Sequence, residues 1–354
     1  MTINVLVTGL GGGGHGEQIL KALKMSTLDL RIAGADITRI SKGLSDVADG
    51  HVLPPATAPN YLDELFALCK AKSIQVLFPG SEPELKKLSA HREDVAKAGM
   101  FMPINTAHVI DTCMDKFKTV RFLTDNGFKF PRTTRITSLD DAKGIDTFPV
   151  VLKPSIGAGG SANAMIAQSK DELLAFCAYL LAIYPEFIVQ EYVGTPDHEY
   201  TVGVLTSLDD GAVINSIAVR RTILSSLSNR LKVKNTSGRA DLGDTLAISS
   251  GISQGHIGKY PEVTSQCEAI AKALGSRGPL NLQCRFANGH VYVFEINPRY
   301  SGTSSMRAMV GFNEPELMIR KHYLHETIPV GFSYREDHML RGLAETFIAD
   351  ESAS

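Results

Sequence analysis

Strand-like and helix-like patterns of apolar residues alternate along the first part of the chain. Apolar runs that fit buried strands occur at residues 3–8, 30–36 and 74–80. Residues 60–72 have apolar side chains at helical spacing, and Ser81 with Glu84 has the spacing of a helix capping box. Strands that alternate with helices favour a parallel sheet covered on both faces. We therefore expect an α/β fold that begins with a Rossmann-like, doubly wound domain over residues 1–110.

The pattern changes near residue 111 and becomes richer in strands. Helices are expected at residues 115–128, 169–184 and 261–274. Strands are expected on both sides of a glycine-rich loop within 148–167, within 186–193 and 198–236, and at 280–287 and 291–297. No repeat or low-complexity linker separates these segments, so we expect domains that pack together.

Composition narrows the class of protein. The 354 residues are 44% hydrophobic and 21% charged, and the formal net charge of −2 gives no overall basic bias toward nucleic acid. No apolar stretch approaches the ~18 residues that span a bilayer, and the N-terminus shows no signal-peptide pattern. Five widely spaced cysteines form no C-x-x-C pair, as expected for reduced thiols. We predict a cytoplasmic protein with neither a nucleic-acid nor a membrane partner.

Two glycine-rich stretches indicate bound phosphate. The first, residues 5–18, contains the G-x-G-x-x-G spacing twice, and Asp36 follows where a ribose-binding acid would stand. This pattern fits an NAD-dependent oxidoreductase. The second, residues 151–163, lies between two expected strands, so its backbone N–H groups would wrap phosphate oxygens, with Lys153 as a point charge. A plain hairpin loop with an exposed lysine is the alternative.

The last two expected strands predict a hairpin with one oxygen-rich face. With a three-residue loop at 288–290, Gln283 stands opposite Glu295, and Asn297 follows on the same face. A two-residue Asn-Gly turn would move Glu295 to the other face of the hairpin, among apolar side chains. The alternation of polar and apolar residues therefore favours a loop with an odd number of residues. The other face collects Leu280, Leu282, Cys284, Phe286, Tyr292, Phe294 and Ile296. A carboxylate with two amide oxygens suits Mg²⁺, although a hairpin that merely has a polar face explains the pattern equally well.

Together these motifs resemble the ATP-grasp superfamily, above all one synthetase module of the carbamoyl-phosphate synthetase large subunit and stand-alone carboxylate–amine ligases. The resemblance covers the chain to about residue 330. It implies a Rossmann-like pre-ATP-grasp domain (1–110), a small lid domain (111–187) and a large domain (188–354) with the hairpin. It also implies that the first glycine loop, with Gly12 and Gly13, faces the acceptor substrate and does not hold a dinucleotide.

The resemblance assigns roles to individual residues. It places Lys116 of "DK" and Lys153 of "LKP" on the ATP phosphates. The remaining ATP contacts would be Gly157, Gly159, Gly160 and Ser161 of the glycine flap, and Gln190, Glu191, Val193 and Glu199 at the adenine and ribose. The metal ligands would be Gln283, Glu295 and Asn297, and Arg299 of "NPR" would act in catalysis together with Lys153. The implied cofactors are ATP and Mg²⁺, as one ion or two, with Mn²⁺ as a substitute.

The segment 220–256 departs from the family pattern. It concentrates the basic residues Arg220, Arg221, Arg230, Lys232, Lys234 and Arg239. Two interpretations stand side by side: an anionic co-substrate received by Arg221 and Arg299, or a solvated basic loop. Gln254 and His256 are further candidates for contact with such a substrate. His15 is another candidate, with a merely solvated loop histidine as the alternative.

We therefore expect an ATP-dependent ligase that joins a small-molecule carboxylate to an amine through an acyl-phosphate, with release of ADP and phosphate. A homodimer would follow the habit of the family. The alternatives are activation of bicarbonate with ammonia as in carbamoyl-phosphate synthetase, an NAD-dependent oxidoreductase, and a non-catalytic nucleotide sensor.

Overall fold

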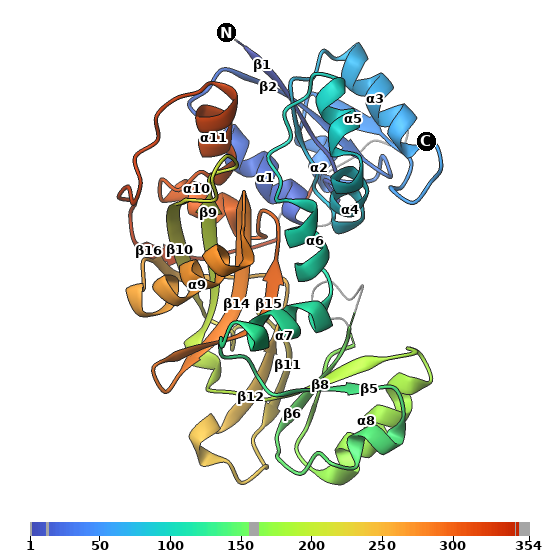
Figure 1. Cartoon of the computed structure of the whole chain (residues 1–354), viewed down its shortest axis with the longest axis vertical. Helices are drawn as coiled ribbons and strands as arrows, with labels where there is room; N and C mark the ends of the chain where they lie inside the picture. Colours follow the sequence, from blue (N-terminus) through green and yellow to red (C-terminus); the bar gives the residue numbers. More distant parts are fainter. Residues whose placement is uncertain (1, 12–13, 156–162, 344, 347–354) are drawn as a thin grey trace.

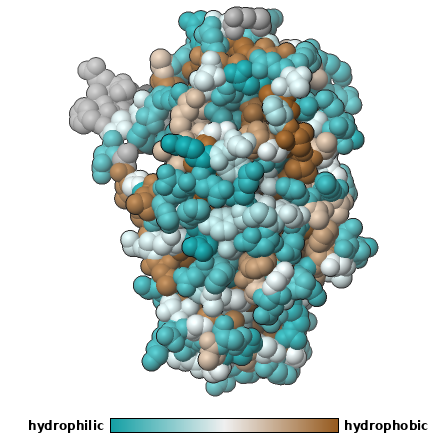
Figure 2. All heavy atoms as spheres, turned by 90° about the vertical axis from the view of Figure 1, so that its left-hand side faces the viewer, coloured by the Kyte–Doolittle hydropathy of each residue, from teal (hydrophilic) through white to brown (hydrophobic). Residues whose placement is uncertain are grey.

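The computed structural model describes residues 2–11, 14–155, 163–343 and 345–346. An N-terminal α/β domain lies at one end of the long axis, a large antiparallel sheet in the middle and a smaller sheet at the other end (Figure 1). None of the helices in these residues is long and apolar enough to cross a bilayer. On the face shown in Figure 2, hydrophilic atoms predominate and apolar atoms form separate, smaller patches.

The N-terminal domain is built on a parallel sheet, as the alternating pattern predicts. Its strands lie in the order β3-β2-β1-β4: β1 (Ile3–Val7), β2 (Leu30–Asp36), β3 (Asp49–Val52) and β4 (Val76–Phe78). Its helices are α1 (His15–Lys24), α2 (Lys42–Ser45), α3 (Tyr61–Ala71), α4 (Glu82–Ala90) and α5 (Arg92–Lys97). The predicted cap of α4 is confirmed, because the Ser81 hydroxyl accepts from the Glu84 N–H. Strand β3 was not predicted.

A second sheet, here called the lid sheet, follows two connecting helices. The helices are α6 (Ala107–Cys113) and α7 (Lys116–Asp125). The strands are β5 (Thr133–Ile136), β6 (Val150–Pro154), β7 (Met165–Ala167) and β8 (Phe187–Glu191), all antiparallel in the order β5-β8-β6-β7. Helix α8 (Lys170–Leu181) buries Leu173, Cys177 and Leu180 against this sheet. The predicted Ser169 cap of α8 is confirmed.

The large sheet carries the predicted hairpin at its edge. Its strand order is β15-β14-β9-β10-β13-β16. The bounds are β9 (Glu199–Thr206), β10 (Val213–Arg221), β13 (Gly255–Gly258), β14 (Pro279–Ala287), β15 (His290–Asn297) and β16 (Asp337–Met339). Helix α9 (Pro261–Leu274) packs on one face, and α10 (Ser304–Met309) and α11 (Glu314–Met318) lie on the other. A separate pair, β11 (Asn229–Lys234) and β12 (Thr245–Ser249), packs against β7 and the residue after β8.

The β14–β15 hairpin has the predicted residue pairing, but its turn and the regularity of its strands differ from the prediction. Gln283 pairs with Glu295, but the loop is a two-residue turn of Asn288 (φ 51°) and Gly289 (φ 76°), so the predicted three-residue loop is wrong. The register shifts between Gln283 and Cys284, which leaves Phe294 as a β-bulge. The turn is one residue shorter than predicted, which alone would move Glu295 to the opposite face from Gln283. The extra residue in β15 compensates for this change.

The bulge also changes which side chains face the core. Val291 and Val293 are buried with Leu282, and Phe286 packs against this cluster. The prediction that Tyr292 and Phe294 join this layer is wrong, because both are half-buried and line a cavity on the other side of the strand.

Candidate nucleotide and metal site

A cavity lies between the lid sheet and the large sheet. It brings together seven of the residues predicted from the sequence: Lys116, Lys153, Gln190, Glu191, Val193, Glu199 and Glu295. Six other predicted residues lie outside the described part of the chain: Gly12, Gly13, Gly157, Gly159, Gly160 and Ser161. The expected glycine flap falls in this last group.

Lys153 reaches the cavity from β6 toward the bulge. Its Nζ lies 3.3 Å from the Phe294 carbonyl oxygen and 5.5 Å from the centre of the Phe294 ring. The pKa of Lys153 is lowered to about 8, mainly by burial and also by the charge of Lys116, while the charges of Glu295 and Glu199 oppose the shift. Two cations therefore meet at one wall of the cavity, an arrangement that an anionic ligand would stabilise.

Lys116 is positioned by the start of helix α7. The Asp115 carboxylate caps this helix by accepting from the N–H groups of Phe117 and Lys118. Lys116 Nζ lies 3.5 Å from the Ser155 carbonyl oxygen, next to the strand that carries Lys153. The sequence motif "DK" therefore combines a helix cap with a cation at the cavity.

Glu199 is held by two arginines. Its Oε1 accepts from Arg221 Nη1 at 3.3 Å and its Oε2 from Arg285 Nε at 3.0 Å, and all three side chains are buried. Arg221, predicted as a substrate contact, also donates to the carbonyl oxygens of Ser250 and Ile252. The structure thus places Arg221 in a buried ion pair, outside the lining of this cavity.

Arg285 is a site residue that sequence reasoning missed. It donates to the carbonyl oxygens of Val193 and Ala247, and its guanidinium lies 4.3 Å from the centre of the Tyr192 ring. The expected adenine hinge at Val193 is therefore fixed by this arginine. The sequence pattern could have identified Arg285 as a site residue, because it lies two residues from Gln283 and therefore on the same face of β14.

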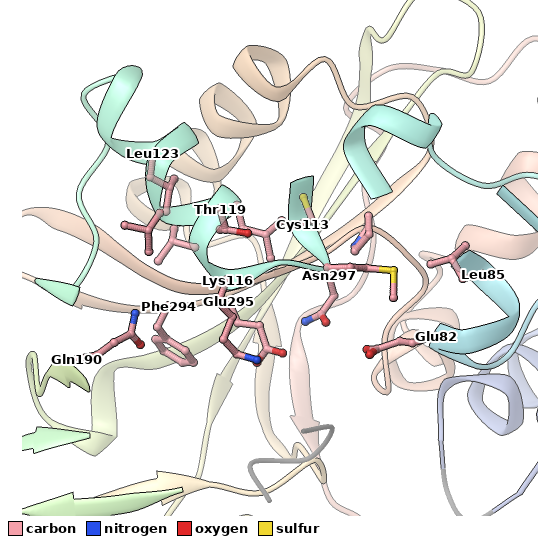
Figure 3. Close-up of a pocket in the computed structure, with 15 residues that line it drawn as sticks. Glu82, Leu85, Cys113, Lys116, Thr119, Leu123, Gln190, Phe294, Glu295 and Asn297 are labelled. Carbon is pink, nitrogen blue, oxygen red and sulfur yellow. The ribbon is translucent and has the colours of Figure 1, made fainter. Parts of the chain in front are cut away.

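The predicted metal-binding face lies at the junction with a second cavity. Figure 3 shows Glu295 and Asn297 along β15, with Lys116 beside Glu295. Asn297 is buried, and its Oδ1 accepts from Arg299 Nη2 at 3.1 Å. Its Nδ2 has no hydrogen-bond partner among the residues that the structure describes. Gln283 is half-buried opposite Glu295.

This donor set fits Mg²⁺ that is shared with a nucleotide. It supplies one carboxylate and two amide oxygens, which are hard ligands but too few to hold an ion alone. Among the described residues, no group of three or more His, Cys, Asp or Glu side chains is placed to hold a metal ion by itself. Phosphate oxygens next to Lys116 and Lys153 would complete the coordination.

Arg299 links the hairpin to the N-terminal domain. Its Nη2 also donates to Glu82 Oε1 at 3.1 Å, and its Nη1 donates to the Tyr300 carbonyl oxygen. In Figure 3 the Glu82 carboxylate points from α4 toward Asn297. Sequence reasoning missed Glu82, whose only local signal is its place in the first turn of a capped helix.

The first glycine loop has a structural explanation. A Cβ on Gly16 would lie 2.3 Å from the Gly9 carbonyl oxygen, and one on Gly80 would lie 1.9 Å from the Thr8 carbonyl oxygen. These glycines let α1 pack closely on the ends of β1 and β4.

Asp36 accepts from the Ile37 N–H and the Ser41 hydroxyl. Nearby, the buried Nε2 of His15 has no hydrogen-bond partner within the described part of the chain. Burial, together with the charge of Arg299, lowers the pKa of His15.

The basic segment does not converge on either cavity. Arg230, Lys232 and Lys234 occupy the exposed positions of β11, and Arg239 pairs with Asp241. Gln254 bonds to Ser225 and Arg341, and His256 Nδ1 lies 2.6 Å from the Tyr260 hydroxyl. The solvated interpretation fits Arg230, Lys232, Lys234 and Arg239. Arg220, Arg221 and His256 instead line a third cavity, together with His198 and His338.

Comparisons with known proteins agree with this geometry. Residues 184–335 match the family "ATP-grasp in the biosynthetic pathway with Ter operon", and residues 5–103 match "PylC-like, N-terminal domain". The chain is 24% identical over 293 residues to the carbamoyl phosphate synthase large chain of Halobacterium salinarum. This alignment covers 80% of the present chain and 26% of the relative. The same enzyme of Mesorhizobium japonicum is 27% identical over 273 residues, covering 73% and 23%. The chain thus spans about a quarter of the length of these relatives.

Solved structures extend the likeness to the whole fold. The L-amino acid ligase of Bacillus licheniformis is 16% identical with a TM-score of 0.60, over 90% of this chain and 73% of that one. A biotin carboxylase–β,γ-ATP complex from Campylobacter jejuni is 14% identical with a TM-score of 0.64, over 94% and 73%. At such low identities the similarity establishes the fold and leaves the substrates open.

Proposed function

Because the chain is a member of the ATP-grasp superfamily, we propose that it is an ATP-dependent carboxylate–amine ligase. The observation that carries the proposal is the meeting of Lys116, Lys153 and Glu295 in one cavity between the lid sheet and the large sheet. Two cations and a metal-binding carboxylate at one place suit the triphosphate of ATP. This chemistry needs both a phosphoryl-transfer site and a place for the acid beside it.

The proposed reaction has two steps. A carboxylate oxygen of the acid attacks the γ-phosphorus of ATP, the bond to the β-phosphate oxygen breaks, and ADP leaves. The amine nitrogen then attacks the carbonyl carbon of the acyl-phosphate, loses a proton, and phosphate departs with the electrons of the C–O bond. Both steps depend mainly on positioning and on neutralised charge.

Each residue of the site has a defined task in this scheme. Lys116 and Lys153 balance the charge of the phosphates, and Arg299 balances the charge that develops on the transferred phosphoryl group. Mg²⁺, held by Gln283, Glu295 and Asn297, would supply further charge neutralisation at the phosphates. Arg285 keeps the hinge at Val193 in place for the base, while Glu199 presents a carboxylate toward the ribose.

The test is a screen of carboxylic acids against amines for ADP release, with mass detection of the product. An acid- and amine-dependent product with one ADP per bond formed supports the proposal. Calorimetry with MgATP and with NAD provides the second measurement. Binding of NAD at micromolar concentration, with no binding of MgATP, would overturn it.

Activation of bicarbonate with ammonia as acceptor is the second candidate. It is favoured by the sequence similarity to carbamoyl phosphate synthase large chains over most of this chain. Release of ADP that depends on bicarbonate, with no added organic acid, would favour this reaction over the ligase.

A further inference from the structure

A third cavity opens at one end of the large sheet. It has a volume of about 280 Å³ and is lined by Asp197, His198, Arg220, Arg221, Thr222, His256 and His338. The side chain of Arg221 pairs with Glu199, which lines the nucleotide cavity. Successive residues of a strand point to opposite faces of a sheet, so Arg220 presents its side chain to the other face. The third cavity and the nucleotide cavity therefore lie on opposite faces of the large sheet.

Cross-strand pairing brings an arginine and two histidines of this lining into one row. Arg220 of β10 pairs with His256 of β13, and His256 pairs with His338 of β16. Residues that pair directly have their side chains on the same face of a sheet. The ring centres of His256 and His338 are 4.9 Å apart, and the rings meet at 73°. On its other side Arg220 pairs with Tyr200, so neither of its cross-strand neighbours is a carboxylate.

Hydroxyl groups hold two of the three histidines of the lining. His256 Nδ1 lies 2.6 Å from the Tyr260 hydroxyl, and His198 Nδ1 lies 3.1 Å from the Thr195 hydroxyl. When a hydroxyl donates to Nδ1, the neutral imidazole carries its proton on Nε2. Each of these rings then has one N–H group for a ligand. Together with the guanidinium of Arg220, they can surround an oxyanion with hydrogen-bond donors.

We propose that this cavity binds the phosphoryl group of a small phosphate monoester. The planar guanidinium of Arg220 suits phosphate, because it can donate two parallel N–H bonds to its oxygens. The imidazoles of His198, His256 and His338 donate to the remaining oxygens. The volume of the cavity is close to the ~300 Å³ at which ligand pockets begin, so a short carbon chain fits beside the phosphate. This site is separate from the proposed ligase reaction and does not depend on it.

Arg220 also argues against a metal ion as the occupant of this cavity. Histidines are common metal ligands, but a guanidinium beside them repels a cation. Within the described ranges, no three or more His, Cys, Asp or Glu side chains are placed to hold a metal ion.

Carboxylates near the row should weaken the binding of an anion. Asp197 is the carboxylate of the lining, and Glu336 stands beside Gly258, outside the lining. Since like charges repel, removal of the charge of Asp197 should strengthen phosphate binding, whereas it would weaken the binding of a cation.

Calorimetry with inorganic phosphate and with glycerol 3-phosphate tests the proposal. The nucleotide cavity is first filled with Mg²⁺ and the β,γ-imido analogue of ATP, because phosphate also suits Lys116 and Lys153. Both probes should bind to this complex at millimolar concentration or below. Absence of glycerol 3-phosphate binding would overturn the proposal. Binding of Zn²⁺ that His338→Ala abolishes, with no binding of phosphate, would overturn it in favour of a metal site.

Two variants with opposite changes of charge locate the bound phosphate. Arg220→Gln, at an exposed side chain, should weaken glycerol 3-phosphate binding by about tenfold or more, because charge-assisted hydrogen bonds are lost. Asp197→Asn should strengthen it by about threefold. The matched control is Arg230→Gln, at an exposed position of β11, which should leave the affinity unchanged. Equal affinities of the Arg220 and Arg230 variants would overturn the proposal.

Histidine ring resonances in NMR spectra provide a readout for each position. The signals of His256 and His338 should shift as glycerol 3-phosphate is added. The signal of His290, exposed at the start of β15, should stay in place. Unchanged signals of His256 and His338 at saturating glycerol 3-phosphate would overturn the proposed site. The thermal midpoint reports whether each variant is folded.

Discussion

The ammonium nitrogen of Lys153 lies 3.3 Å from the carbonyl oxygen of Phe294, the residue that bulges out of strand β15. One irregularity in the edge strand thus has two consequences. It returns Glu295 to the face opposite Gln283, and it gives Lys153 an acceptor across the cavity. The lid sheet and strand β15 are joined at this point.

Nucleotide binding should weaken as the pH rises through about 8. Burial lowers the pKa of Lys153 to about 8, so the side chain is an ammonium below this pH and a neutral amine above it. The phosphates prefer the ammonium, so the Kd for MgADP should be flat below pH 8 and rise by up to about tenfold per pH unit above it. Calorimetry across this range measures the effect. Lys153→Met should bind MgADP more weakly and lack the inflection; an unchanged inflection in this variant would contradict the assignment.

Glu295→Gln should remove the benefit that Mg²⁺ brings to nucleotide binding. Glu295 carries the only formal negative charge among the proposed metal ligands, and glutamine keeps its shape while it removes the charge. ADP affinity of the native protein should increase on addition of Mg²⁺, and that of the variant should not. Turnover should fall by about a hundredfold or more. The side chain is half-buried at a cavity, so the thermal midpoint should change little.

Elements with strong local signals could be predicted from the sequence. Helix α7 has its cap at Asp115, and α9 ends at Gly275 with φ 69°, so local chemistry defines both. The short strands β3, β5, β13 and β16 were missed, as was the five-residue strand β12. Each of the four short strands has three or four residues that include polar side chains, and each becomes a strand only because a neighbouring strand offers hydrogen bonds.

The site was predictable where a motif is continuous and unpredictable where the fold brings distant residues together. Lys116, Lys153 and Glu295 stand in recognisable short motifs. The pairing of Glu82 with Arg299 joins residues 217 positions apart, and no local pattern reports it. The bulge at Phe294 was unpredictable for the same reason, because period-2 counting assumes a regular strand.

Glu199→Gln should destabilise the protein strongly. The carboxylate is buried between Arg221 and Arg285, and removal of its charge leaves two buried guanidinium groups without their anion. Loss of one partner from a buried ion pair costs about 3–5 kcal/mol. Urea unfolding measures the change. Asp125→Asn, which removes one side of the exposed pair with Arg121, is the control and should cost less than about 1 kcal/mol. A similar loss in both variants would contradict the structural role of Glu199.

Gly289→Ala should cost stability through the backbone alone. Gly289 has φ 76° in the two-residue turn of the β14–β15 hairpin, and an added Cβ would have no atom within 4 Å. The left-handed conformation costs a residue with a Cβ about 1 kcal/mol, so the free energy of unfolding should fall by that amount. Gly144 is equally open, and its φ is outside the left-handed region, so Gly144→Ala should be neutral or slightly stabilising. The affinity for MgADP should stay the same in both variants, because the bulge at Phe294 separates the turn from Glu295. Equal stability of the two variants would contradict the two-residue turn.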